Sequence, residues 1–222
     1  MKFTIEALYA LHIFNDYSDD LVFLPTPFKE GEGKKEGLLR ILEAGYEDLK
    51  KMGLVLDNKP TEECAEYGLY LKEYHDAEYH CQIDLNYFYA PQVDEFNNMA
   101  VIIHQDDEGL YHINRTGDLV FLAFLMQHHP VLQNVDDKIK DYLHSQWEEE
   151  AYLRFMVHHG NDEGIHITVA NFGKITQDIL YVTNSEHLYK YDLEHQLLCS
   201  IDSEQLKKEI LRKLKVKVYN GG

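Results

Sequence analysis

Short segments of alternating apolar and polar residues constrain the fold more than any other feature of this chain. The alternation runs through residues 81–90, and two further strand-like segments, 100–104 and 109–115, are joined by the turn-forming sequence QDDEG. A period of two is typical of β-strands, and strands joined by short turns pair antiparallel. The middle of the chain is therefore expected to form an antiparallel sheet, with 81–90 as a single strand.

A second group of strand-like segments occupies the other half of the chain. These segments are separated by turn residues such as GNDEG and NFGK, and they span 151–159, 164–171, 178–183, 187–192 and 195–201. Strands grouped with helices in this order predict an α+β fold, here one domain over 1–222 with pseudo-repeated halves of about 1–132 and 133–222. The expected architecture is a central twisted antiparallel sheet with quasi-two-fold halves flanked by helices.

Helical periodicity and capping residues mark the segments between the strands. Thr4 and Thr61 are suitable N-caps, Gly53 is a helix stop, and Asp118 is the expected cap of a buried apolar helix that ends before Pro130. The expected helices cover 3–16, 38–51, the residues from Thr61 to Tyr74, 117–129, 136–147 and 203–219. A short strand is expected at 21–25, and the glycine- and lysine-rich residues 31–37 are expected to form a surface loop.

Composition excludes several classes of function. The 222 residues carry 39 Asp and Glu against 21 Lys and Arg, a net charge of -18, which argues against binding nucleic acid or anionic membrane surfaces. No apolar run approaches the roughly 20 residues of a membrane-spanning helix, and the first residues lack the shape of a signal peptide. Three widely spaced cysteines form no CxxC pair. We expect a reduced cytoplasmic protein with no stable membrane insertion.

The sequence contains no recognisable catalytic or cofactor motif. The sequence contains no phosphate-binding loop and no GxSxG motif, and its 13 histidines include no HEXXH motif. The histidine groups that could be metal ligands are His75 with His80 and Cys81, His104 with His112, and the pairs 128–129 and 158–159. Carboxylate runs at 19–20, 106–108, 136–137 and 148–150 fit solvated turns and helix starts. We therefore expect a non-enzymatic protein with no catalytic, cofactor or metal residues.

Sixteen tyrosines leave two interpretations open. Tyrosine offers a large rigid surface with a polar tip, which suits both the rim of a core and a contact with a partner protein. The tyrosines concerned are Tyr67, Tyr70, Tyr74, Tyr79, Tyr87 and Tyr89. From the residues alone, a binding role is favoured only because no active site is visible.

The order of these signals resembles the EspG-like chaperones of type VII (ESX) secretion, together with the shorter EsaE-like proteins. The family opens with a motif of the type F-x-[LI]-x-E-x-x-x-L, matched here by Phe3, Ile5, Glu6 and Leu11. A Leu-Pro-x-Pro-like stretch follows at 24–27, and a helix ends L-x-x-x-G-L at 49–54. A strand-rich half, a helix ending near Pro130 and a C-terminal helix beginning near 202–203 complete the pattern.

This resemblance implies a cytoplasmic, non-enzymatic chaperone or adaptor with an EspG-like central sheet. Its expected partner is a helical secreted substrate of the WxG or LXG type, and the secretion ATPase is a possible second partner. An exposed apolar helical tip self-associates unless it is covered, and a net charge of -18 helps to keep such a complex soluble.

Two other interpretations remain open on the sequence alone. A small acidic protein can cover the basic cleft of a toxin such as a nuclease, which is the role of an immunity protein or antitoxin. A metal-dependent hydrolase would use some of the 13 histidines. The sequence identifies neither the partner nor the contact surface.

Overall fold

A computed structural model describes residues 1–15, 17, 20–94, 96–133, 144–146, 164–184 and 187–217. The helices are α1 (Ile5–Phe14), α2 (Lys34–Lys51), α3 (Glu62–Asp76), α4 (Asp118–His128), the short 3-10 helix η1 (Pro130–Leu132) and α6 (Ser203–Lys213). The strands are β1 (Val55–Leu56), β2 (Lys59–Pro60), β3 (Tyr79–Ile83), β4 (Tyr87–Asp94), β5 (Met99–Gln105), β6 (Tyr111–Gly117), β7 (His144–Gln146), β8 (Gly164–Asn171), β9 (Lys174–Asn184), β10 (His187–Asp192) and β11 (Leu197–Ile201).

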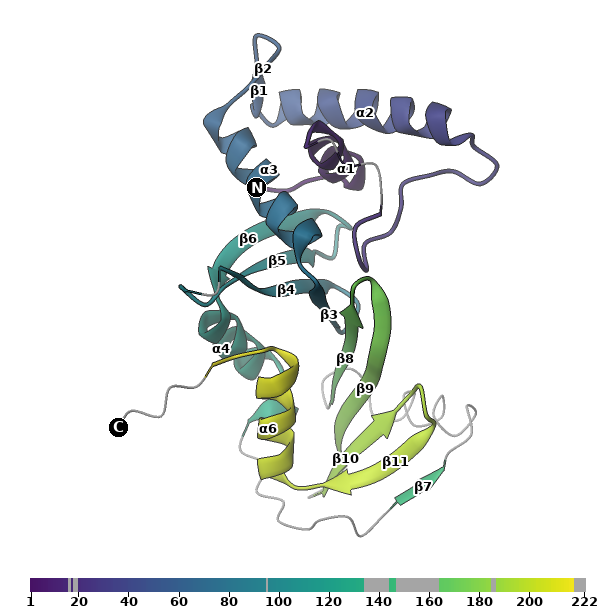
Figure 1. Ribbon diagram of the computed structural model, residues 1–222, viewed down its shortest axis with the longest axis vertical. Helices are drawn as coiled ribbons and strands as arrows, with labels where there is room; N and C mark the ends of the chain where they lie inside the picture. Colours follow the sequence, from purple (N-terminus) through teal and green to yellow (C-terminus); the bar gives the residue numbers. More distant parts are fainter. Residues whose placement is uncertain are drawn as a thin grey trace.

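Nine of the described strands form one antiparallel sheet, in the order β6-β5-β4-β3-β8-β9-β10-β11-β7 (Figure 1). The expected α+β class with a helix-flanked antiparallel sheet is thus confirmed. The sheet consists of two meanders, β3–β6 and β8–β11, that meet where β3 pairs with β8, and of β7, which pairs with β11 at the edge. Each meander is followed by a helix, α4 or α6, so the order of elements in the two meanders is the same.

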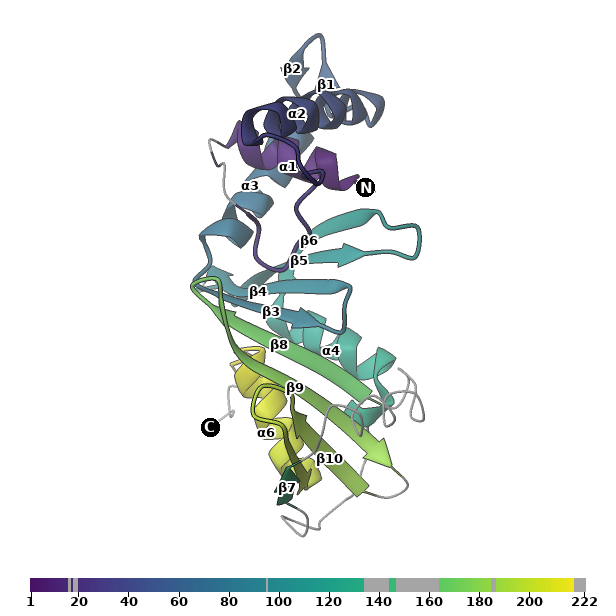
Figure 2. The same ribbon diagram turned by 90° about the vertical axis from the view of Figure 1, so that its right-hand side faces the viewer.

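Helices cover the two faces of the sheet differently (Figure 2). α1, α2 and α3 lie on one face of the first meander, where Phe88, Val101 and Ile103 join their core. α4 and α6 share the opposite face, where Phe121 and Leu206 pack with strand residues of both meanders. The alternation along β4 explains this division, because Phe88 and Tyr89 point to opposite faces.

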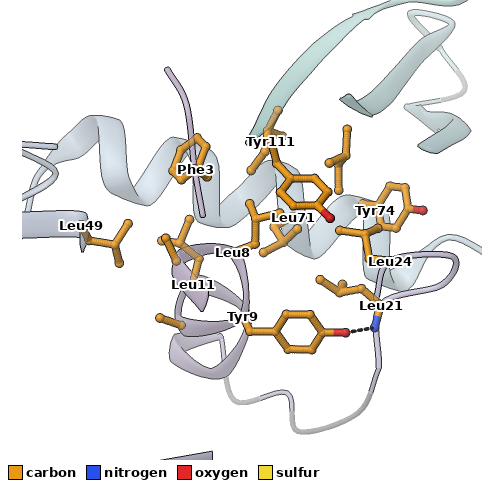
Figure 3. Packing of buried hydrophobic residues seen from close by; sticks show 14 of the residues in the cluster. Phe3, Leu8, Tyr9, Leu11, Leu21, Leu24, Leu49, Leu71, Tyr74 and Tyr111 are labelled. Atoms are coloured by element: carbon orange, nitrogen blue, oxygen red, sulfur yellow. Dashed lines mark hydrogen bonds between the residues drawn. The ribbon is translucent and has the colours of Figure 1, made fainter. Parts of the chain in front are cut away.

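The core around α1 is tightly packed. Phe3, Leu8, Leu11 and Leu49 are buried there, and Phe3 also pairs with the edge strand β6 through Tyr111 (Figure 3). α1 and α2 cross at Gly45, where an added Cβ would meet the carbonyl oxygen of Glu6 at 2.3 Å. Only glycine allows so close an approach of two helices at that point.

The capping and stop signals of the first helices are confirmed. The side chains of Thr4 and Thr61 accept hydrogen bonds from the backbone N–H groups of Ala7 and Cys64, both at 3.1 Å. Gly53 has the positive φ of a helix stop, +77°. The hairpin of 100–104 and 109–115 is also confirmed, as β5 and β6.

Two expected strands are wrong. Residues 81–90 form two strands, since Asp84 adopts a positive φ of 51° and the chain reverses between β3 and β4. Residues 21–25 are irregular, because side chains hold this segment from outside: Tyr74 donates its hydroxyl to the carbonyl of Val22 at 2.7 Å, and Tyr9 accepts from the N–H of Leu21 (Figure 3). The buried Leu21 and Leu24 of this irregular segment join the core around α1.

Several expected helix boundaries also need correction. Residues 34–37 belong to the first turn of α2 rather than to a loop, Gly117 rather than Asp118 is the N-cap of α4, and α6 ends at Lys213 instead of 219. Within the helix expected at 136–147, His144–Gln146 are the strand β7. The rest of that helix and the strand expected at 151–159 lie outside the described residues.

The two meanders are also joined through the C-terminal end of α6. The hydroxyls of Tyr79 and Tyr89, on β3 and β4, donate to the carbonyls of Lys213 and Leu214 at 2.7 and 3.0 Å. The thiol of Cys81 donates to the Lys213 carbonyl at 3.3 Å. A helix leaves its last carbonyls without helical partners, and here the first meander supplies them.

Candidate functional site

α4 is an apolar helix that is largely exposed in the structure. From Leu119 to Met126 every residue is apolar, and a helix that is apolar on all sides is normally buried on all sides. Within α4, however, only Asp118, Phe121 and Leu125 are buried. Leu119, Val120 and Met126 are 53%, 62% and 42% exposed. The expectation of a buried helix at 117–129 is therefore wrong for most residues of α4.

Two apolar residues of α4, Leu122 and Met126, line a groove. Leu119, Leu122, Ala123 and Met126 recur at i, i+3, i+4 and i+7, which places them on one side of the helix. That side borders a groove of about 240 Å³ between α4, η1 and α6. The lining residues are Leu122, Met126, Val131, Leu132, Gln133, Ser203, Leu206, Lys207, Ile210 and Leu211.

Local hydrogen bonds hold the ends of the two helices that wall the groove. The side-chain amide of Gln133 donates to the carbonyl of Met126 at 2.7 Å, and His128 contacts the carbonyl of Phe124 at 2.8 Å, so the last carbonyls of α4 are satisfied. Pro130 then starts η1, whose buried residues Val131 and Leu132 lie at the edge of the core. The opposite wall begins at a capping box, in which Asp202 and Gln205 bond reciprocally.

The chemistry of the groove favours a helical ligand. Its walls are α-helices, so their backbone N–H and C=O groups are used within the helices and cannot pair with an added strand. A ligand in this groove must satisfy its own backbone, as a helix does, and offer apolar side chains to the lining. Each half-exposed leucine or methionine that it covers contributes about 1 kcal/mol.

Two other hollows are larger, but several of their polar side chains are paired within the protein. One, of about 400 Å³, is lined by Lys72, Glu73 and Asp76, of which Lys72 binds Asp76 at 2.8 Å and Glu73 binds Arg115 at 2.7 Å. The other, of about 430 Å³, lies between α1, α2 and α3, and Asn15 at its wall donates to the carbonyl of Gly68.

The histidines and cysteines that the sequence singles out do not converge. His80 is buried and contacts the carbonyl of Tyr74 at 2.7 Å, whereas His75 contacts Asp76. Burial raises the pKa of the Cys81 thiol to about 12, which keeps it protonated. In the described part of the chain, no three His, Cys, Asp or Glu side chains are grouped so that they could hold a metal ion.

His104 and His112 do face each other across β5 and β6, with ring centroids 6.0 Å apart. His112 also contacts Asp106 at 3.1 Å, and Lys2 binds the same carboxylate at 2.9 Å. Burial lowers the pKa of His104, and the neighbouring His112 lowers it further. Asp106 also accepts the backbone N–H groups of Glu108 and Leu110, so it closes the turn of the hairpin.

The tyrosines lie mostly in the core or at its rim. Tyr74 and Tyr89 are fully buried, and the partly buried members of the group pack against one of the two main clusters; these are Tyr67, Tyr70, Tyr79 and Tyr87. Among the described residues, no helix is both long and apolar enough to cross a membrane. The carboxylate runs 136–137 and 148–150 and the pair 158–159 lie outside the described residues.

Fold and groove together define an α+β protein with a helix-walled apolar groove on one face of its sheet. A scan against models of known protein families finds no match for the chain. No curated protein matches it either. The function must therefore be argued from the groove itself.

Proposed function

We propose that this protein is a non-enzymatic chaperone or adaptor that holds a helical secreted protein in the groove between α4 and α6. The observation that carries the proposal is the exposed apolar side of α4: Met126 lines the groove and is 42% exposed, and Leu119, on the same side of the helix, is 53% exposed. Apolar surface of this kind on a helix marks a binding site when it borders a groove.

The resemblance to the EspG-like chaperones gives the proposal its biological form. In that form the protein is cytoplasmic, its substrate is a WxG- or LXG-type protein of type VII secretion, and the bound substrate stays soluble until it reaches the secretion ATPase. The groove suits such a substrate because a helical hairpin presents apolar side chains at i, i+3, i+4 and i+7.

The proposal predicts that a WxG- or LXG-type protein is encoded beside this chain, and co-expression of the two proteins tests it. We expect a stoichiometric complex and a larger soluble fraction of the secreted protein. The double variant Leu119→Ser with Met126→Ser should lose the complex, whereas Leu56→Ser, at a 60% exposed leucine on the distant β1–β2 hairpin, should keep it. Equal binding by both variants would remove the groove from the proposal, and the absence of any complex would remove the chaperone function.

The net charge of -18 favours a second candidate, an immunity protein that covers a basic toxin. The groove does not suit that role, because its α6 wall is one of the few basic places on the chain. Inhibition of a neighbouring nuclease that is unaffected by Leu119→Ser with Met126→Ser would establish this second function at another surface.

A further inference from the structure

The two walls of the groove differ in charge. The α4 wall has no charged residue from Leu119 to Gln127. Residues 207–217, which start within the α6 wall, hold 6 of the 21 Lys and Arg residues of the chain. Because the whole chain has a net charge of -18, such a concentration of positive charge is a local exception.

The exposed cations of α6 are available to a ligand. Lys207 lines the groove and is exposed, and it makes no ion pair with any residue that the structure describes. Lys208, one position further round the helix, is 72% exposed and binds Glu204 at 2.6 Å. Lys213 and Lys215 are not exposed in the same way, because Lys213 is buried and Lys215 lies over the ring of Tyr79. Among the described residues, Lys207 is therefore the unpaired cation that lines the groove, and the exposed Lys208 beside it is shared with Glu204.

We propose that the groove selects an amphipathic helix whose acidic side chains lie along one side of its apolar stripe, the side that faces α6. The side that faces α4 is uncharged. A helix with acidic residues on that flank gains attraction from Lys207 and Lys208, whereas a basic flank is repelled. The proposal rests on the proposed function and adds to it the chemical class and the orientation of the partner.

A pair of synthetic peptides of about five helical turns tests this charge selection. Both carry leucine at i, i+3, i+4 and i+7, and one has glutamate and the other lysine along one flank, with glutamine along the other flank. We expect the glutamate peptide to bind the full-length protein about 10-fold more tightly at low salt, and the difference to shrink as salt is added.

The variant Lys207→Glu with Lys208→Glu provides the matched reversal. It should bind the lysine peptide more tightly than the glutamate peptide, while its thermal unfolding stays close to that of the parent, since both side chains are exposed. Lys29→Glu with Lys59→Glu, which changes the net charge equally at exposed sites on other elements, should leave the order of the peptides unchanged.

The outcomes separate this proposal from the proposed function. Equal affinity for the two peptides, with binding lost in Leu119→Ser with Met126→Ser, would overturn the charge selection and leave the groove as a helix site. Binding of neither peptide would overturn both. A dimer that dissociates on Leu119→Ser would identify a second copy of the chain as the occupant, which also overturns the proposal.

Discussion

α4 and α6 occupy corresponding places in the fold but differ in their N-terminal capping and in the side chains that they expose. α6 follows its meander through a capping box, buries Leu206 and Ile210, and turns a charged face to solvent. α4 follows its meander through Gly117, which provides no side-chain cap, and exposes apolar residues. Among the described residues, α6 exposes the charged face that is typical of a helix at a protein surface, whereas α4 exposes an apolar one, and the proposed binding site rests on that difference.

The largest effect is expected at Leu125, and its neighbour Met126, on a different side of α4, provides the comparison. Leu125 is fully buried, and Leu125→Ala should lower the free energy of unfolding by about 3 kcal/mol because it leaves a cavity. Met126→Ala should change it by less than about 0.5 kcal/mol, since that side chain is 42% exposed. Urea denaturation measures both. Similar losses for the two variants would mean that Met126 is already covered.

A buried lysine at the end of α6 gives the next effect. Lys213 is 3% exposed, and its ammonium donates to the side-chain oxygen of Gln177. Burial lowers its pKa from 10.5 to about 8, with partial compensation from Glu209. Between these two values unfolding takes up a proton, so the stability of the parent protein should rise with pH in that window.

Lys213→Met removes this titration. The variant should be more stable than the parent protein by about 1 kcal/mol at pH 7, because a buried charge is replaced by an apolar side chain. Its advantage should be complete below pH 8 and should shrink as the pH rises above that value. Thermal unfolding at pH 7 and pH 9.5 checks the prediction, and an advantage that grows with pH would contradict it.

The capping box of α6 offers an effect of similar size. Asp202 accepts the backbone N–H of Gln205 at 2.7 Å, and Asp202→Ala should cost about 1 kcal/mol of stability. Asp202→Asn keeps an acceptor at the same place and serves as the control. A full loss in the asparagine variant as well would assign the effect to the negative charge rather than to the hydrogen bond.

The smallest effect should come from giving α4 the cap that α6 already has. Gly117 has an extended backbone, and an added Cβ would meet Val120 at an ordinary 3.8 Å. Gly117→Ser should therefore stabilise the protein by about 0.5 kcal/mol, through the cap and a less flexible unfolded chain. Destabilisation would show that Gly117 has a role in β6 that a side chain disturbs.

The sequence predicts those elements whose local signals agree with their surroundings. The stripe of Leu206, Ile210 and Leu214, the cap at Thr61 and the hairpin before Gly117 are all found where expected. The strands expected at 81–90 and 21–25 are wrong for physical reasons that the local sequence pattern does not contain. Asp84 takes a left-handed turn inside an unbroken alternation, and contacts from Tyr9 and Tyr74 hold residues 21–25 in a loop.

The groove was missed although its signal is present in the sequence. Residues 119–126 are apolar without helical periodicity, a pattern that is typical of complete burial. The same pattern also describes a helix that is buried on one side by its own protein and exposes apolar side chains on another. Only the positions of η1 and α6 distinguish the two cases, and those positions depend on contacts between distant parts of the chain.

The hydrogen bonds from Tyr79 and Tyr89 to the end of α6 have a consequence for synthesis on the ribosome. The partners are separated by 134 and 125 residues. While the chain is being made, the first meander and α4 emerge long before the second wall of the groove exists. α4 is therefore synthesised before its neighbour α6, and the groove forms only after residue 214 has left the exit tunnel. Any partner that requires both walls must bind after translation of this part of the chain.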